Sequence, residues 1–82
     1  MKQSKLYGKA LQAFRTELKR VNRELDYINR NLGRFMGSVL EEKKARRLVL
    51  WHRKTWLDRQ IAETEIKVKR AKAGETYWER KS

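Results

Sequence analysis

One repeating spacing constrains this chain more than any other feature. Through the first 35 positions, apolar side chains recur at alternating intervals of four and three residues. The nine residues of this series are Tyr7, Leu11, Phe14, Leu18, Val21, Leu25, Ile28, Leu32 and Phe35. Such spacing places side chains on one face of an α-helix, as in coiled coils whose helices pack along their length. The series covers about four heptads, so we predict one long helix over residues 4–33.

A second long helix is predicted over residues 38–73. The chain contains no proline, and none of its four glycines falls inside this stretch, which therefore lacks strong helix breakers. Gly33 suits the left-handed position that ends a helix, and Gly74 suits the same position at the end of the second helix. Ser38 and Glu41 have the spacing of a capping box. A connection this short makes the helices antiparallel neighbours, so the predicted fold is an all-α antiparallel helical hairpin.

The apolar side of the second helix is less regular, which leaves its packing open. Its members are Val39, Leu50, Leu57, Ile61, Thr64 and Val68, with Lys43 and Lys54 at the margin. Thr55 and Asp58 have the spacing of a weaker capping pair, so a break near residues 55–58 would give a three-helix bundle instead. Dimerisation of the hairpin into a four-helix bundle is a further arrangement. We treat residues 1–82 as one helical domain that ends in a short aromatic and basic tail, residues 74–82.

Positive charge dominates the composition. The 82 residues include 22 Lys and Arg against 10 Asp and Glu, a formal net charge of +12. Each half of the chain carries +6, so neither half is a detachable basic arm. Three acid–base pairs at a spacing of four support the second helix: Glu42–Arg46, Glu63–Lys67 and Glu65–Lys69. Self-repulsion at this charge opposes compact folding, and a partner of opposite charge relieves it.

The face of the first helix opposite the apolar series is predicted to form a basic ridge. Its members are Lys2, Lys9, Lys19, Arg20, Arg23, Arg30 and Arg34, and Tyr27 stands among them. Asp26 is the only acidic residue that points the same way, because Glu17 and Glu24 lie nearer the apolar series, where they can pair with the facing helix. A row of cations of helical length suits a phosphate backbone. The predicted phosphate contacts are Arg20, Arg23, Arg30 and Arg34, and the surface is extended by Arg46, Arg47, Arg53 and Lys54.

The densest basic segment, KKARRLVLWHRKTW at residues 43–56, also holds two tryptophans. At ~100° per residue, Leu50, Trp51 and Trp56 point in different directions, and one facing helix cannot cover all three. The tryptophans are either core of a larger bundle or contacts for a partner, since exposed apolar patches mark interaction sites. Trp and Arg anchor protein interfaces, and aromatic residues among cations hold single-stranded nucleic acid. The candidate partner or stacking residues are Trp51, Trp56, Tyr77 and Trp78.

Patterns of catalytic or metal-binding residues are missing from the sequence. There is no Cys and a single His, His52, so no Cys–His metal site or nucleophile–base pair can be assembled. No glycine-rich phosphate loop, secretory signal or apolar run of membrane-spanning length is present. We therefore expect a protein that is not an enzyme and uses no cofactor, metal, small-molecule substrate or membrane. Its expected location is the cytoplasm of a cell or an infected cell.

Three functions remain open on these grounds. The first is nucleic-acid binding, with RNA slightly preferred over DNA because exposed aromatic residues suit unpaired bases. The basic antiparallel hairpin resembles, in architecture alone, plasmid-encoded proteins that bind RNA loop complexes. The alternative is a protein-binding regulator or inhibitor of a nucleic-acid-processing complex, of the phage or mobile-element type, for example a CRISPR inhibitor. The second alternative is a structural homodimeric bundle.

Overall fold

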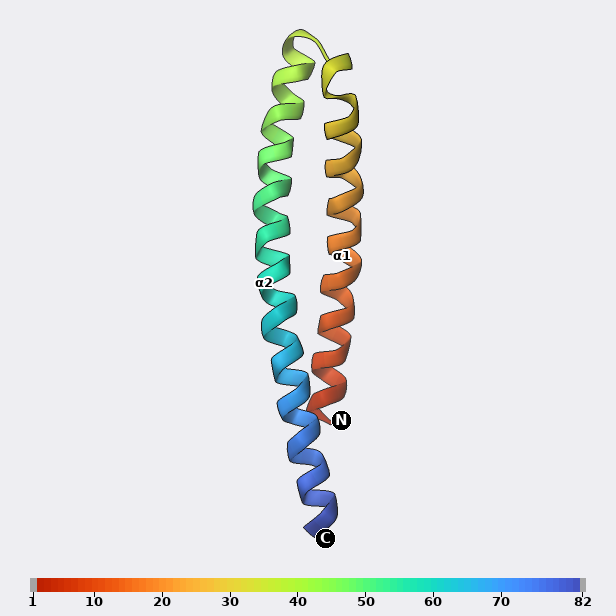
Figure 1. Ribbon diagram of the computed structural model, residues 1–82, viewed down its shortest axis with the longest axis vertical. Coiled ribbons are helices and arrows are strands. Elements are labelled where there is room, and N and C mark those ends of the chain that lie inside the picture. The colour runs from red at the N-terminus through yellow and green to blue at the C-terminus, as the bar shows by residue number, and fades with distance from the viewer. Residues whose placement is uncertain (1, 82) are drawn as a thin grey trace.

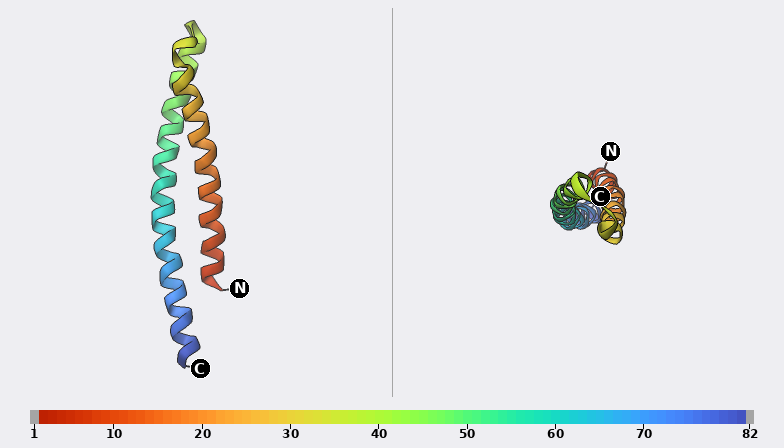
Figure 2. Two further views of the ribbon diagram at one scale, coloured as in Figure 1. Left: turned by 45° about the vertical axis from the view of Figure 1, so that its right-hand side comes forward. Right: turned by 90° about the horizontal axis from the view of Figure 1, so that it is seen from above.

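The fold is a hairpin of two long antiparallel helices, as predicted. The computed structural model describes the backbone of residues 2–81 and the side chains of residues 2–75. Helix α1 (Gln3–Asn31) leads through a short 3-10 turn, η1 (Leu32–Arg34), into helix α2 (Gly37–Lys81). The helices lie side by side over the length of α1, and α2 continues past the start of α1 (Figure 1); the view turned by 45° agrees (Figure 2). The described chain measures 67 × 17 × 14 Å.

The apolar core lies along the single line where α1 meets α2. Its buried apolar residues are Leu11, Val21, Leu25 and Ile28 of α1 and Leu50 and Leu57 of α2. The other members of the nine-residue series are half-buried, so the predicted packing face of α1 is confirmed. On α2 the predicted side is also inward, except at Val39, which is 46% exposed. Val39 lies in the first turn of α2, next to the connection between the helices.

The connection between the helices depends on a different glycine from the one predicted. Gly37 adopts the left-handed conformation, with φ of +59°, and Gly33 lies within η1 without a positive φ. Because α2 begins at Gly37, Ser38 lies inside its first turn and does not occupy the capping position that the sequence indicated. The prediction of a left-handed Gly33 was wrong because the chain makes a 3-10 turn before it reverses.

Helix α2 is continuous for 45 residues, which excludes the three-helix alternative. Within the segment where a break was expected, the Thr55 hydroxyl donates a hydrogen bond to the carbonyl oxygen of Trp51, one turn earlier, at 3.0 Å. The helix also passes through Gly74, which does not end it as expected, and continues to Lys81. A single glycine inside a helix costs about 1 kcal/mol relative to alanine, too little to stop a helix that gains contacts beyond it.

Those further contacts are made by Glu75, which closes the open end of the hairpin. Its carboxylate accepts hydrogen bonds from the Ser4 hydroxyl at 2.8 and 3.0 Å and from the Ser4 backbone N–H at 3.2 Å. Lys2, the residue before α1, makes no side-chain cap, so Glu75 supplies an acceptor that the first turn of α1 otherwise lacks. The side-chain hydrogen bond from Ser4 holds the pKa of the Glu75 carboxyl below its ordinary value.

The core can be tested with two leucines on the same helix. Leu57 is fully buried and Leu48 is 59% exposed. We expect Leu57→Ala to lower the free energy of unfolding by about 2–4 kcal/mol, because a buried side chain is lost and a cavity is left. Leu48→Ala is expected to change it by less than about 0.5 kcal/mol. Urea denaturation followed by far-UV circular dichroism measures both, and equal losses would contradict the described packing.

The turn can be tested with two glycines that both have open space around an added Cβ. Gly37→Ala forces an L side chain into the left-handed region, and we expect it to destabilise the protein by about 1–2 kcal/mol. Gly33→Ala meets no such strain and reduces the freedom of the unfolded chain, so we expect it to be neutral or to stabilise by up to about 1 kcal/mol. Urea midpoints that rank the two variants in the opposite order would place the left-handed residue at Gly33.

Candidate nucleic-acid interface

The basic ridge lies on the surface of α1 and of η1, which holds Arg34. Arg20 lies at the edge of the ridge, where it lines a shallow groove with Arg46 and Arg53 of α2. Arg20, Arg23 and Arg34 are exposed and make no ion pair within residues 2–75. The Nε of Arg30 donates a hydrogen bond to Oδ1 of Asp26 at 3.1 Å, so the one outward acid is already paired with a ridge arginine. The four arginines predicted from the sequence to contact phosphates are therefore all exposed, three of them on α1 and Arg34 in η1.

Two of the α2 cations predicted to extend this surface instead form ion pairs with acids of α1. Arg46 donates from Nε and Nη2 to the two carboxylate oxygens of Glu24, at 3.0 and 3.1 Å. Arg53 contacts Oε1 of Glu17 through Nε at 2.8 Å and through Nη2 at 2.7 Å. We call these two interhelical pairs, which lie on one side of the hairpin, the paired flank. Glu17 and Glu24 thus meet the facing helix, as the sequence indicated.

The i,i+4 pairs expected within α2 are replaced by other pairs. Arg46 binds Glu24 of α1, and Glu65 accepts from Nη2 of Arg15, also on α1, at 2.8 Å. Glu63 pairs with Arg59, one turn before it, at 3.3 Å. Pairs within one helix and pairs between helices are worth similarly small energies at an exposed surface, so their relative geometry decides which of them forms.

The pair between Glu24 and Arg46 perturbs both ionisable groups. The hydrogen bond from Arg46 lowers the pKa of the Glu24 carboxyl, partial burial opposes this shift, and the positive charges of Arg46 and Lys43 add to it. The same hydrogen bond raises the pKa of the Arg46 guanidinium. Glu24 is therefore a carboxylate over the physiological pH range, and its charge is directed at α2, away from the ridge.

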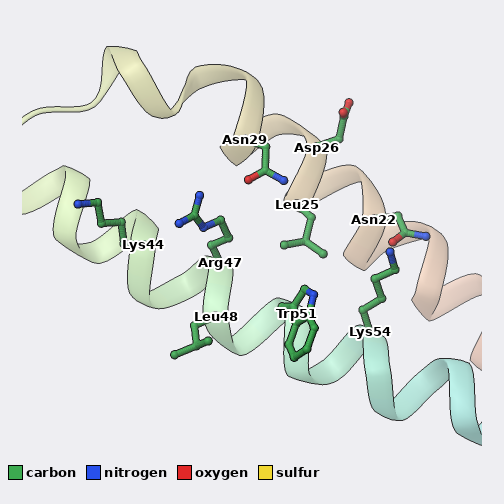
Figure 3. Close-up of a pocket in the computed structure, with 9 residues that line it drawn as sticks. All are labelled: Asn22, Leu25, Asp26, Asn29, Lys44, Arg47, Leu48, Trp51 and Lys54. Carbon is green, nitrogen blue, oxygen red and sulfur yellow. The ribbon is translucent and has the colours of Figure 1, made fainter.

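The other two predicted α2 cations, Arg47 and Lys54, line a groove on the opposite side of the hairpin. This open groove has a volume of about 720 Å³. Its walls are formed by Asn22, Leu25, Asp26 and Asn29 of α1 and by Lys44, Arg47, Leu48, Trp51 and Lys54 of α2 (Figure 3). Arg47 and Lys54 are half-buried and have no acidic partner within residues 2–75. The positive charge of the open groove is therefore not neutralised within residues 2–75, whereas the arginines of the paired flank are bound by carboxylates.

The two central tryptophans have different surroundings. Trp56 packs edge-on against Phe14, with ring centroids 5.7 Å apart, and the Cζ atom of Arg53 lies 4.4 Å from its ring centroid. Trp51 borders the open groove, and its ring contact within residues 2–75 is with its neighbour His52, at 5.6 Å. Trp56 is thus part of the hairpin contact, and Trp51, at 56% exposed, is the more accessible ring.

Two candidate aromatic residues cannot be placed in the same way. The predicted tail is helical as far as Lys81, so Tyr77 and Trp78 belong to α2. Their side chains lie outside the described residues, and their predicted role as partner or stacking groups stays a prediction.

Sequence reasoning missed the asparagines Asn22 and Asn29. Both side chains line the open groove, and neither amide has a hydrogen-bond partner within residues 2–75. The signal was present as a spacing, because Asn22 and Asn29 are seven residues apart on α1, as are Arg47 and Lys54 on α2. The heptad spacing marks each pair as lying on one face, but only the register of the two helices brings the pairs together.

Comparisons with protein-family models, with curated proteins and with solved structures find no match to this chain. Across the described part of the chain, no helix is both long enough and apolar enough to cross a membrane. The same residues contain no cluster of three His, Asp or Glu side chains placed to hold a metal ion.

The ion pair on the paired flank makes a prediction about pH. Because folding lowers the pKa of Glu24, the stabilisation from its carboxylate is present above the unfolded-state pKa and is lost as the pH falls through the folded-state pKa. Glu24→Gln should therefore lower the urea midpoint slightly at neutral pH and leave it unchanged in acid below the folded-state pKa. The effect is small because the pair is largely exposed.

Asp58→Asn is the matched control for this experiment. Asp58 is exposed and makes no ion pair within residues 2–75. We expect its replacement to leave the midpoint nearly unchanged at both pH values. If the Glu24→Gln deficit persists undiminished in acid, the carboxylate charge is not the source of the stabilisation.

Proposed function

We propose that this protein binds nucleic acid, with RNA preferred over DNA, along the basic ridge of α1. The observation that carries the proposal is the exposure of Arg20, Arg23 and Arg34 without an acidic partner within residues 2–75. Within α1 the row from Arg20 to Arg30 extends over ~15 Å, and Arg34 continues it in η1, a length that suits several successive phosphates. Arginine also presents a planar fork of donors that matches phosphate oxygens. The proposed activity is binding without catalysis, in the cytoplasm of a cell or an infected cell.

The placement of the acidic residues supports binding over a role in solubility alone. Glu17 and Glu24 lie on the same helix as most of the ridge arginines and could neutralise their charge. Their carboxylates instead form ion pairs with Arg53 and Arg46 of α2. The ridge therefore keeps its positive potential, and a chain of net charge +12 attracts polyanions over a distance that depends on ionic strength. A role in solubility alone does not require the acidic side chains to be held apart from the basic ridge.

The preference for RNA rests on exposed aromatic rings beside the cations. Tyr27 stands on the ridge with more than half of its surface exposed, and its ring lies 6.5 Å from that of Phe35. Trp51 is exposed beside the open groove. Protein recognition of RNA is directed mainly at unpaired bases, which stack on such rings, whereas the bases of a DNA duplex are hidden in its stack.

The test is a pair of charge reversals with the same change in net charge. Arg23→Glu combined with Arg30→Glu reverses two ridge positions, and Lys69→Glu combined with Arg70→Glu reverses two exposed positions on α2. We expect the ridge variant to lose at least about tenfold more affinity for single-stranded RNA than the control variant. We also expect the slope of log affinity against log salt to fall by about 0.7 per lost phosphate contact.

Fluorescence anisotropy of a labelled RNA over a series of salt concentrations measures both quantities. Far-UV circular dichroism of each variant checks that the hairpin is intact. If the two variants lose affinity equally, net charge alone drives binding and the ridge has no special role. If the unsubstituted protein binds neither RNA nor DNA at low salt, the proposed function is wrong.

A specific observation also favours a second candidate, a protein-binding regulator of a nucleic-acid-processing complex. Leu48, Val49 and Ile66 leave more than half of their surfaces exposed on α2, as does Trp51. Exposed apolar residues interleaved with arginine are typical of protein interfaces. On this candidate the basic ridge meets an acidic protein surface or a protein-bound RNA. A homodimeric bundle would cover the same apolar residues, and light scattering on RNA-free protein separates the dimer from the regulator.

A further inference from the structure

The two sides of the hairpin treat their cations in opposite ways. On the paired flank, Arg46 and Arg53 are held by Glu24 and Glu17. In the open groove, Arg47 and Lys54 are half-buried but have no acidic partner within residues 2–75. A cation that is partly withdrawn from water without a counter-charge is poised for an anion from outside. The open groove therefore differs from the paired flank in that its positive charge has no counter-charge within residues 2–75.

The groove lining repeats along the hairpin axis. Figure 3 shows Arg47 extending toward Asn29 and Lys54 extending toward Asn22, so each cation of α2 faces an amide of α1. Seven residues separate the two positions on each helix, which corresponds to ~10.5 Å. Trp51 stands between the two positions, beneath Leu25 (Figure 3). The order along the groove is thus cation and amide, aromatic ring, cation and amide.

The groove lining combines an aromatic ring, two amides and two cations. The exposed indole of Trp51 offers a flat surface for a planar ring. The two amides each present donors and an acceptor, and neither has a partner within residues 2–75. The two cations offer charge to anions on either side of the ring. A volume of about 720 Å³ lies within the range of sites that hold small molecules.

We propose that the open groove is a slot for one unpaired nucleotide of a bound nucleic-acid strand. The base stacks on Trp51, its polar edge meets Asn22 or Asn29, and the phosphates on either side of it meet Arg47 and Lys54. This assignment rests on the proposed function and adds to it the place where a base, as distinct from the backbone, is contacted. A phosphorylated peptide or a lipid headgroup would supply the anion but not the planar ring with a polar edge.

Two acids near the groove define where the phosphates go. Asp26 lines the α1 wall and is paired with Arg30 at 3.1 Å, and its charge disfavours a phosphate in the middle of that wall. Glu41 lies 3.8 Å from Nζ of Lys44, which makes Lys44 the weaker anion site of the groove cations. The phosphates are thereby directed to Arg47 and Lys54, and the base is left over Trp51. A base inside a duplex cannot take this position, because its faces are covered by its neighbours.

The experiment compares two single strands of equal length and charge. One is a uniform oligoribonucleotide, and the other is the same ribose-phosphate strand without bases. We expect the protein to bind the base-bearing strand about tenfold to a hundredfold more tightly, as expected for the stacking of a base on an aromatic ring. We expect Trp51→Leu to abolish this preference while leaving affinity for the base-free strand unchanged. Asn22→Ala combined with Asn29→Ala should reduce the preference severalfold.

Matched controls keep the result specific to the groove. Trp56→Leu makes the same replacement on the paired flank, and Gln12→Ala removes an exposed amide of α1 outside the groove. Both should keep the preference for bases, and circular dichroism identifies any variant that has lost its helices. Since Trp56 contacts Phe14, Gln12→Ala serves as the control if Trp56→Leu unfolds.

Failure of the slot and failure of the proposed function give different results. If neither strand binds, the proposed function is wrong and the slot is wrong with it. If both strands bind with equal affinity, the protein binds polyanions but has no base slot. If Trp51→Leu keeps the preference, the base is contacted elsewhere. If light scattering shows a dimer that Trp51→Leu dissociates, a second copy of the chain occupies the groove and the slot is overturned.

Discussion

With only two helices, a side chain can leave water only along the line where α1 meets α2. Leu25, Ile28, Leu50 and Leu57 lie on that line, and their burial fixes the rotation of each helix about its own axis. Once the rotation is fixed, every other position is assigned to a flank or to an outer face. The basic ridge, the paired flank and the open groove are all consequences of this one contact.

Charge is distributed unevenly around that contact. The acids Glu17 and Glu24 fall beside the core on one flank and are bridged by arginines from α2. The corresponding positions on the opposite flank include the neutral asparagines Asn22 and Asn29, so the cations across from them keep their charge unbalanced. The hairpin thus has one flank closed by ion pairs and one flank, beside an exposed Trp51, that is open to an anion.

The periodicity of α1 predicted the fold because burial of its apolar series is the main favourable term in folding, and Ile28, at 1% exposed, is the most deeply buried member of that series. The turn, the end of α2 and the open groove could not be predicted from the sequence. The choice between Gly33 and Gly37 depended on a 3-10 turn, and Gly74 was overridden by the contact between Glu75 and Ser4. The open groove was missed because it requires the axial register of the helices, which no local pattern specifies. The exposure of the ridge arginines followed from the helical period alone, except that Arg34 lies in η1 and not on the predicted helix.

The hydrogen bonds between Ser4 and Glu75 join residues 71 positions apart, whereas contacts beside the turn join residues that are near in sequence. Each step away from the turn closes a longer loop, whose entropic cost grows with its length. We therefore expect the two helices to associate from Gly37 toward the termini and to separate in the reverse order. The described end at Ser4 and Glu75 is then expected to open first, so that amide protons there exchange with solvent sooner than those near Ile28 and Leu50.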